Sequence, residues 1–232
     1  MKKVNLVMAL AFAAVCAFGK EYYVNPDPDK ASNAYDGEAA VYDGTHGPKL
    51  TLAGVMAVAK KSGDIVYAAE GVYTNEVMSQ VSESYSGKAR FVSSRVIVPA
   101  GVTLQSAAGA EKTFVIGAPA TDESGNPVTE NDGCGTNSVR CVKLEANAKL
   151  IGFTVTGGRA PRGLKDATTY WNAQGGGIYA RDSSLVADCV LSNNVAYNSG
   201  NAGVYGTYLR CRVVDNDGVG TGTIDAGWIY DC

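Results

Sequence analysis

The chain has 232 residues, of which 46% are hydrophobic and 19% are charged, so it can bury a core of its own. Its formal net charge is −3 and it contains no basic cluster, which argues against nucleic acid as a partner because phosphate binding requires positive charge. The 28 glycines and the many short runs of β-branched and aromatic residues predict strands separated by frequent turns.

Residues 1–19 have the pattern of a secretory signal peptide. Lys2 and Lys3 precede an apolar run, which ends in the cleavage-site pattern of residues 17–19 (AFG). The run is too short to span a membrane, and no later stretch is apolar enough to do so. A lipoprotein is the weaker alternative, since Cys16 follows a poor lipidation sequence. We therefore expect a protein that is secreted, or held on the outer surface of a bacterial cell.

The N-terminal region, residues 20–93, combines a strand, a loop and a helix. "KEYYVNPDP" predicts a short strand that ends in a polar turn, and residues 25–48 read as a loop rich in Asp, Gly and Asn. "DIVYAAEGVY" predicts a second strand ending at Gly71. Between them, helical spacing predicts an amphipathic helix over about 49–61, with an apolar face formed by Leu52, Val55, Met56 and Ala59.

Residues 94–232 consist of short apolar runs separated by Gly, Asn, Asp or Pro. In this region Cys189, Cys211 and Cys232 are 22 and 21 residues apart, and each follows a charged residue. Asn194 and Asn216 are spaced alike, while Phe153 takes the cysteine position one repeat earlier. A period near 22, with two or three short strands in each repeat, predicts the stacked coils of a parallel β-helix, an all-β solenoid.

In such a stack, equivalent side chains of successive coils form columns. We expect Phe153 and the repeated cysteines to form one buried column, since a free thiol behaves as a small hydrophobic group. We expect Asn194 and Asn216 at turns with a left-handed backbone, with their amides bonded to each other. The glycines before Ile178 and Val204 are expected to bend the chain sharply.

Two parts of the sequence resemble known families. Residues 44–73, with Gly63-Asp64 and the GVY of residues 71–73, resemble the N-terminal part of secreted right-handed β-helix proteins of the pectin lyase-like superfamily. This resemblance implies a right-handed coil whose open N-terminal end is covered by the amphipathic helix. The GGI of residues 176–178 and the LSNN of residues 191–194 resemble repeats of polymorphic outer-membrane and adhesin-like proteins, with Phe replaced in the second motif. The fold hosts both enzymes and binding proteins, so the chemistry stays open.

Polysaccharide lyases of this superfamily use a basic residue and a calcium ion held by carboxylates. The resemblance therefore implies that basic and acidic residues of this chain are candidates for these roles. Residues 159–162 (RAPR) are one residue short of one lyase motif, and the basic candidates are Arg181, Arg210 and Arg212. The candidate calcium ligands lie in residues 121–133 and are Asp122, Glu123, Glu130 and Asp132. Their order does not match an EF-hand loop. For all these residues, and for the lone His46, a solvated surface position is the better interpretation.

We accordingly predict no metal site and no cofactor, with Ca²⁺ only if the chain is a lyase. Removal of residues 1–19 leaves five cysteines, and the flanks of one short loop make Cys134 and Cys141 the best disulfide candidates. A zinc site is not expected, because the chain has no C-x-x-C motif and its only histidine is far from the cysteines in sequence.

The most informative polar segment is an insertion at residues 159–174. Its binding candidates combine basic and aromatic groups: Arg159, Arg162, Lys165, Tyr170 and Trp171. Inserted loops of a solenoid often form a binding wall, and guanidinium groups pair well with carboxylates. The alternative is a loop that only packs Trp171 against the stack.

These patterns favour a secreted or cell-surface binding protein, adhesin-like, whose partner is an extracellular glycan or another component of a host or cell surface. The alternative is a polysaccharide lyase of the pectate or pectin type, or a degenerate relative, acting by β-elimination. The chain stops at Cys232 in mid-coil, so we expect a monomer or a part of a longer chain, truncated at its C-terminal end.

Overall fold

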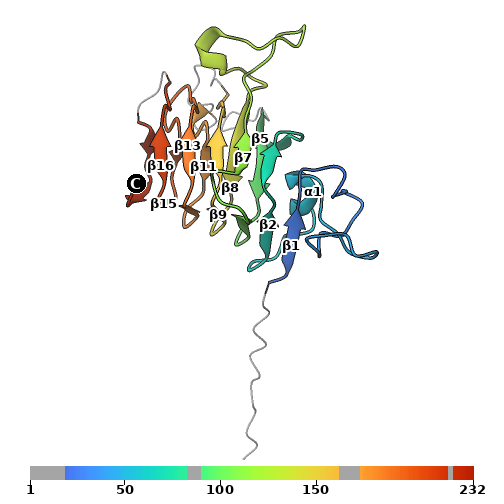
Figure 1. The fold of residues 1–232 in the computed structure, drawn as a ribbon. Coiled ribbons are helices and arrows are strands. Elements are labelled where there is room, and N and C mark those ends of the chain that lie inside the picture. Colours follow the sequence, from blue (N-terminus) through green and yellow to red (C-terminus); the bar gives the residue numbers. More distant parts are fainter. Residues whose placement is uncertain (1–18, 83–89, 162–172, 219–221) are drawn as a thin grey trace, which may run out of the picture.

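The computed structural model describes residues 19–82, 90–161, 173–218 and 222–232. Within these residues the regular structure is almost entirely β, in three sheets whose strands pair in parallel except for β4 and β5. The strands follow one another along a single axis, from the blue N-terminal end to the red C-terminal end (Figure 1). All-β architecture with parallel strands agrees with the sequence prediction.

Each strand of the described chain belongs to one of the three sheets. The seven-stranded sheet contains, in spatial order, β1 (Glu21–Val24), β2 (Ile65–Ala68), β6 (Thr103–Ser106), β9 (Lys149–Ile151), β12 (Leu185–Ala187), β15 (Thr207–Leu209) and β18 (Trp228–Tyr230). The five-stranded sheet contains β16 (Arg212–Val214), β13 (Val190–Ser192), β10 (Thr154–Thr156), β7 (Thr113–Ile116) and β3 (Gly71–Tyr73). The six-stranded sheet contains β17 (Ile224–Asp225), β14 (Gly203–Val204), β11 (Ile178–Ala180), β8 (Val139–Leu144), β5 (Arg90–Val98) and β4 (Met78–Ser82).

From β6 onward the chain visits the seven-, five- and six-stranded sheets in turn, and we call one such passage a coil. Successive coils pair in register: Val155 pairs with Leu191, and Leu191 with Val213. The strands of the N-terminal region join the same sheets, since β1 pairs with β2 and β3 pairs with β7. The predicted boundary at residue 94 therefore falls inside β5.

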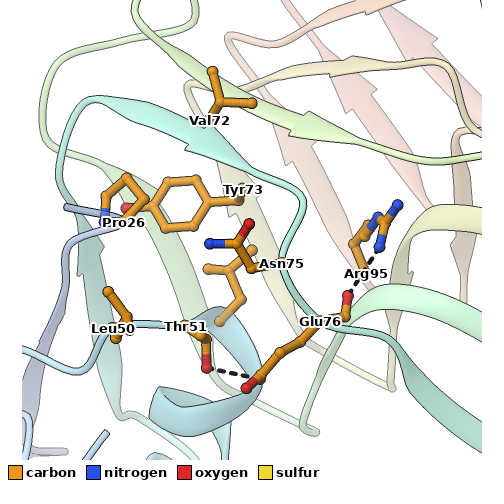
Figure 2. Close-up of a pocket in the computed structure, with 9 residues that line it drawn as sticks. Pro26, Leu50, Thr51, Val72, Tyr73, Asn75, Glu76 and Arg95 are labelled. Atoms are coloured by element: carbon orange, nitrogen blue, oxygen red, sulfur yellow. Dashed lines mark hydrogen bonds between the residues drawn. The ribbon is translucent and has the colours of Figure 1, made fainter. Parts of the chain in front are cut away.

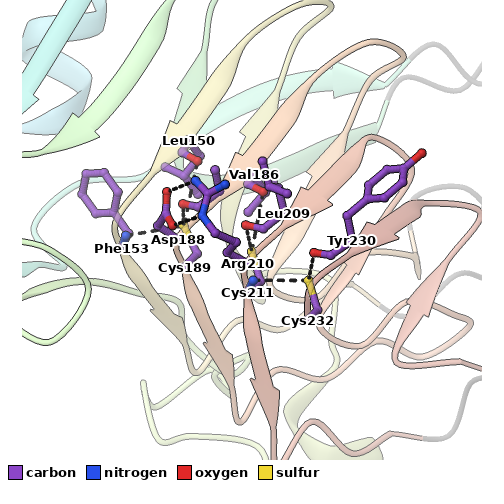
Figure 3. A network of polar contacts seen from close by, with 11 residues as sticks. Leu150, Phe153, Val186, Asp188, Cys189, Leu209, Arg210, Cys211, Tyr230 and Cys232 are labelled. Atoms are coloured by element: carbon purple, nitrogen blue, oxygen red, sulfur yellow. Dashed lines mark hydrogen bonds and ion pairs between the residues drawn. The ribbon is translucent and has the colours of Figure 1, made fainter.

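The predicted column of Phe153, Cys189 and Cys211 is confirmed, with exposed fractions of 0%, 1% and 3%. The backbone N–H of Phe153 lies 3.4 Å from Sγ of Cys189, and that of Cys211 lies 3.2 Å from Sγ of Cys232, as Figure 3 shows. Cys232 is exposed. The period near 22 is thus the number of residues between equivalent buried positions in successive coils.

The residue before each column member lies at a corner between two strands. Gly152 (φ +76°), Asp188 (φ 54°) and Arg210 (φ 49°) all have left-handed backbones there. Runs such as "KLIGFTVTG" are therefore two strands, β9 and β10, and not one. The outward position at the corner explains the charged residues, because Arg210 donates to both carboxylate oxygens of Asp188 at 2.7 Å. "DIVYAAEGVY" is likewise split into β2 and β3.

The asparagine pair is confirmed, but its backbone geometry differs from the prediction. Nδ2 of Asn194 donates to Oδ1 of Asn216 at 3.0 Å, and Asn194 is completely buried. The left-handed residues are the ones before them, Asn193 (φ 51°) and Asp215 (φ 51°). A solvent-facing corner residue adopts the left-handed backbone, and the following asparagine turns inward to bond with the next coil.

The glycines before Ile178 lie at a bend, as predicted, since the chain bends at residues 176 and 177 and Gly175 has a left-handed backbone (φ +64°). Gly177 has a further role in close packing. Gly177 has no left-handed backbone. A Cβ atom on it would lie 2.5 Å from the carbonyl oxygen of Ala202 and 2.9 Å from the side chain of Asn194. Glycine at this position therefore lets neighbouring coils approach each other.

The helix α1 (Leu52–Met56) is much shorter than the predicted 49–61. Oγ1 of Thr51 caps it by accepting from the N–H of Gly54 at 3.0 Å. Its predicted apolar face is nevertheless buried, including Ala59 beyond its end. A turn, η1 (Glu130–Gly133), completes the helical elements of the described chain. In this part of the protein no helix has the length and hydropathy needed to cross a membrane.

Candidate functional site

The predicted binding insertion is only partly described. Arg162, Lys165, Tyr170 and Trp171 lie outside the described residues, so their roles stay predictions. Arg159 is described, and its guanidinium bonds to backbone carbonyls: Nε donates to Asp132 at 2.9 Å and Nη1 to Asn193 at 2.7 Å. Arg159 therefore joins the loop after β7 to the coils.

The far end of the insertion is held by Arg140, a fully buried residue on β8. Its Nε donates to the carbonyl oxygen of Gly175 at 2.6 Å and its Nη2 to that of Gln174 at 2.7 Å. The guanidinium also lies 5.0 Å from the centre of the Tyr179 ring. Burial lowers the pKa of Arg140 to about 10, so the side chain stays charged at neutral pH. Both ends of the insertion are thus fixed to the coils.

Two of the three basic lyase candidates have carboxylate partners in the described chain. Arg210 is bound by Asp188, and Nε of Arg181 lies 3.9 Å from Oε2 of Glu145. Arg212 is exposed at the start of β16.

The carboxylates of the acidic segment 121–133 do not converge on one point. Oδ1 of Asp122 accepts from the backbone N–H groups of Ser124 and Asn126 at 2.9 Å, closing a turn of its own. Among the described residues, no three carboxylate, imidazole or thiol groups of this segment have ligand atoms within 4.8 Å of one another. The segment projects above the coils as a yellow-green loop in Figure 1.

The predicted disulfide between Cys134 and Cys141 is not formed, and all five described cysteines are free thiols. The thiol of Cys134 donates to the carbonyl oxygen of Val195 at 3.8 Å, whereas that of Cys141 donates to Thr156 at 3.1 Å. Cys141 points into the core from β8, and Cys134 follows η1. Burial raises the pKa of Cys134 to about 11 and that of Cys141 to about 12, so both stay protonated.

A small cavity of about 10 Å³, between α1 and β3, has room for about one water molecule and no ligand (Figure 2). Glu76 crosses it: its Oε2 accepts from Oγ1 of Thr51 at 2.7 Å, and its backbone carbonyl accepts from Nη1 of Arg95 at 3.3 Å. These bonds join the helix to the six-stranded sheet. We assign the cavity a structural role.

A larger hollow, of about 330 Å³, lies on the outer face of the seven-stranded sheet at its β1 end. This volume is at the lower end of the range for small-molecule sites, about 300–1,000 Å³. We call it the tyrosine hollow, and it is lined by Glu21, Tyr23, Val24, Asn25, Ala40, Pro48, Tyr67, Ala69 and Ala107. Strands β1 and β2 form its floor, and the loop of residues 25–48 forms its wall.

Strand alternation places two tyrosines on this floor. Tyr23 on β1 is the register partner of Tyr67 on β2, and the residues on either side of each point into the core. Their rings are stacked, with centres 5.7 Å apart and planes 26° apart. Both rings are half-buried, so part of each ring remains accessible to a ligand.

Polar groups stand at the edge of the rings. The hydroxyl of Tyr23 donates to Oε2 of Glu21 at 3.2 Å, and Asn25 lies two residues further along the chain. Burial, and then the bond to Glu21, raises the pKa of Tyr23, so its hydroxyl stays protonated at neutral pH. The hollow therefore combines an apolar floor with a hydroxyl, a carboxylate and an amide that can bond to a polar ligand.

The wall is fixed to the floor by backbone bonds. The N–H of Tyr23 donates to the carbonyl oxygen of Gly37 at 2.7 Å, and the N–H of Lys49 donates to that of Tyr23 at 2.9 Å. Loop residues thereby pair with the outer edge of β1, which protects an otherwise open sheet edge.

The tyrosine hollow was not predicted from the sequence. The signal was present, since "EYYV" and "IVYA" each place a tyrosine third in a strand of alternating burial. The two tyrosines become neighbours only because β1 and β2 pair in this register, which the sequence pattern does not reveal.

A comparison with known protein families finds no family model that matches the chain, and a comparison with curated proteins finds no significant match. The function is therefore inferred from the fold and from the tyrosine hollow.

Proposed function

We propose that this protein is an exported bacterial β-helix protein, adhesin-like, which binds carbohydrate outside the cell or at its surface through the tyrosine hollow. The predicted signal peptide supports export. The binding surface would be one of two, since the insertion at 159–174 stays a second candidate.

Regarding the fold, we propose a right-handed parallel β-helix of the pectin lyase-like superfamily. The repeated passage through three parallel sheets supports it, because β–crossover–β connections between parallel strands are right-handed in about 98% of cases. The resemblance of residues 44–73 to that superfamily supports it too. In this proposal α1, whose apolar side buries Leu52, Val55 and Met56, covers the open end of the first coil.

The observation that carries the binding proposal is the stacked pair Tyr23 and Tyr67 beside Glu21. Sugar rings have apolar C–H faces and hydroxyl edges, so they suit a site with an aromatic floor and polar groups at its rim. The Glu21 carboxylate accepts hydroxyl hydrogens but repels carboxylates. We therefore expect neutral sugars to bind here better than uronic acids.

The proposal is tested by probing a glycan array with the full chain and titrating the best glycan by calorimetry. Tyr67→Ala should weaken binding by about 1–3 kcal/mol, by analogy with base–aromatic stacking. Tyr230→Ala is the matched control, because Tyr230 is an exposed tyrosine on β18, in the same outward row of the same sheet. Absence of glycan binding, or equal affinity of the wild type and Tyr67→Ala, would contradict the proposal.

A further inference from the structure

We propose that the loop of residues 25–48 holds a divalent transition-metal ion of the zinc type through Asp36, Glu38 and His46. One ligand atom from each of the three side chains lies within 4.8 Å of the other two. Nδ1 of His46 is already in contact with Oδ2 of Asp36. Among the described residues no other group of three such side chains converges in this way.

The backbone of the loop brings these residues together. The N–H of Gly37 donates to the carbonyl oxygen of Gly47 at 2.9 Å, which places residues 36 and 38 opposite residue 46. The rings of Tyr35 and Tyr42 stack with centres 4.4 Å apart and planes 10° apart, and so join the two sides of the loop.

Asp43 holds the histidine segment in place. Its Oδ1 accepts from the backbone N–H groups of Thr45 at 2.8 Å and His46 at 2.7 Å. The turn that carries His46 is therefore closed by two bonds to a carboxylate that is not itself a proposed ligand. The ligand-bearing backbone is organised before any ion arrives, so binding requires only side-chain movements.

The donor set indicates the class of metal. One imidazole nitrogen with two carboxylate oxygens suits Zn²⁺, whereas Mg²⁺ and Ca²⁺ favour sites made of oxygen atoms alone. Bonds of about 2.0–2.1 Å in tetrahedral geometry require ligand atoms roughly 3.3 Å apart. The side chains are 36–45% exposed and can rotate to reach that separation, leaving the fourth position to water.

The charges around the site favour a dication. The site has three carboxylates, from Asp36, Glu38 and Asp43. One ammonium group lies beside them: Nζ of Lys20 is 2.8 Å from Oε1 of Glu38. Lys20 compensates only one of these negative charges. A bound ion would compete with Lys20 for Glu38, so removal of the lysine should strengthen metal binding.

The ion would act on the neighbouring hollow by bracing its wall. Ala40 and Pro48, which line the tyrosine hollow, belong to the same loop as the three ligands. Metal binding itself does not require that the hollow bind a glycan, so the two proposals can fail separately.

The test is calorimetric titration of zinc chloride into the full chain after treatment with EDTA and removal of the chelator. We expect one ion per chain. His46→Ala should lower the affinity at least about 100-fold, because loss of a mere outer-shell partner of a ligand already costs 10–100-fold. Lys20→Gln should raise the affinity several-fold, and Asp29→Asn, which removes an exposed carboxylate from the same loop, should leave it unchanged.

Circular dichroism establishes that the exposed-site variants are folded, and Glu38→Gln provides a second ligand variant whose affinity should also fall. Absence of zinc uptake by the wild-type chain would overturn the proposal. So would zinc binding that His46→Ala and Glu38→Gln leave unchanged, since the ion would then be held elsewhere.

Discussion

Replacement of Asn194 by alanine tests the stacking of the coils. Asn194 has no exposed surface, and its side chain joins three segments. Its Oδ1 accepts from the N–H of Gly158 at 2.9 Å, and its Nδ2 donates to the carbonyl oxygen of Val155 at 2.9 Å and to Oδ1 of Asn216 at 3.0 Å. In Asn194→Ala these partners remain while their bonds to the amide are lost.

The expected loss of stability depends on which hydrogen bonds each partner of Asn194 retains in the variant. Oδ1 of Asn216 keeps its bond from the backbone N–H of residue 194, at 3.1 Å. The N–H of Gly158 is buried and loses its side-chain acceptor, which costs about 1–3 kcal/mol. With the lost bond to the carbonyl oxygen of Val155 and the space left by the amide, we expect the free energy of unfolding to fall by about 2–4 kcal/mol.

The assay is urea denaturation followed by circular dichroism, with linear extrapolation of the free energy of unfolding. Asn216→Ala is the graded comparison, because that side chain is half-buried and water can replace part of what it loses, so we expect a smaller fall. Asn75→Ala, at an exposed position, should change stability by less than about 0.5 kcal/mol. A loss below about 0.5 kcal/mol for Asn194→Ala would refute the role assigned to the asparagine pair.

Three further predictions concern the thiols, the lyase alternative and the insertion. In the native protein an alkylating reagent should modify Cys232 quickly but Cys134 and Cys141 only after unfolding, as mass spectrometry of the peptides would show. If Cys134 and Cys141 resist alkylation even in the unfolded chain, they are oxidised and the prediction is wrong. Polygalacturonate with calcium should yield no unsaturated product by absorbance, and product release that Arg162→Ala abolishes would instead establish the lyase. Trp171→Ala should weaken glycan binding by about 1–3 kcal/mol if its ring stacks on the ligand; a lower melting temperature with unchanged binding would show that the ring only packs.

The repeat was predictable from the sequence because it reflects which positions each coil buries. Phe153, Cys189 and Cys211 share a chemical property, low polarity, and one position in the coil, so their spacing reveals the period without any knowledge of the fold. The charged residues before the cysteines were recognised as a pattern, but their meaning needed the backbone. Asp188 and Arg210 stand at left-handed corners, where the side chain faces solvent and pairs with the next coil.

The tyrosine hollow was not predictable by the same reasoning. It depends on the pairing of β1 with β2, which are about forty residues apart in sequence, and on the path of the loop between them. The proposed metal ligands also needed that path, because Asp36 and His46 become neighbours only through the backbone bond between Gly37 and Gly47. Contacts of this kind follow from tertiary structure, whereas the period of a repeat is local.

A crystal structure of the protein with a glycan selected on the array would decide both the proposed fold and the proposed binding site. We expect a right-handed coil of three parallel sheets, with a sugar ring lying against Tyr23 and Tyr67 and a hydroxyl within hydrogen-bonding distance of Glu21. A left-handed coil would contradict the proposed fold. A glycan bound elsewhere, with the tyrosine hollow empty at saturating ligand, would contradict the proposed site.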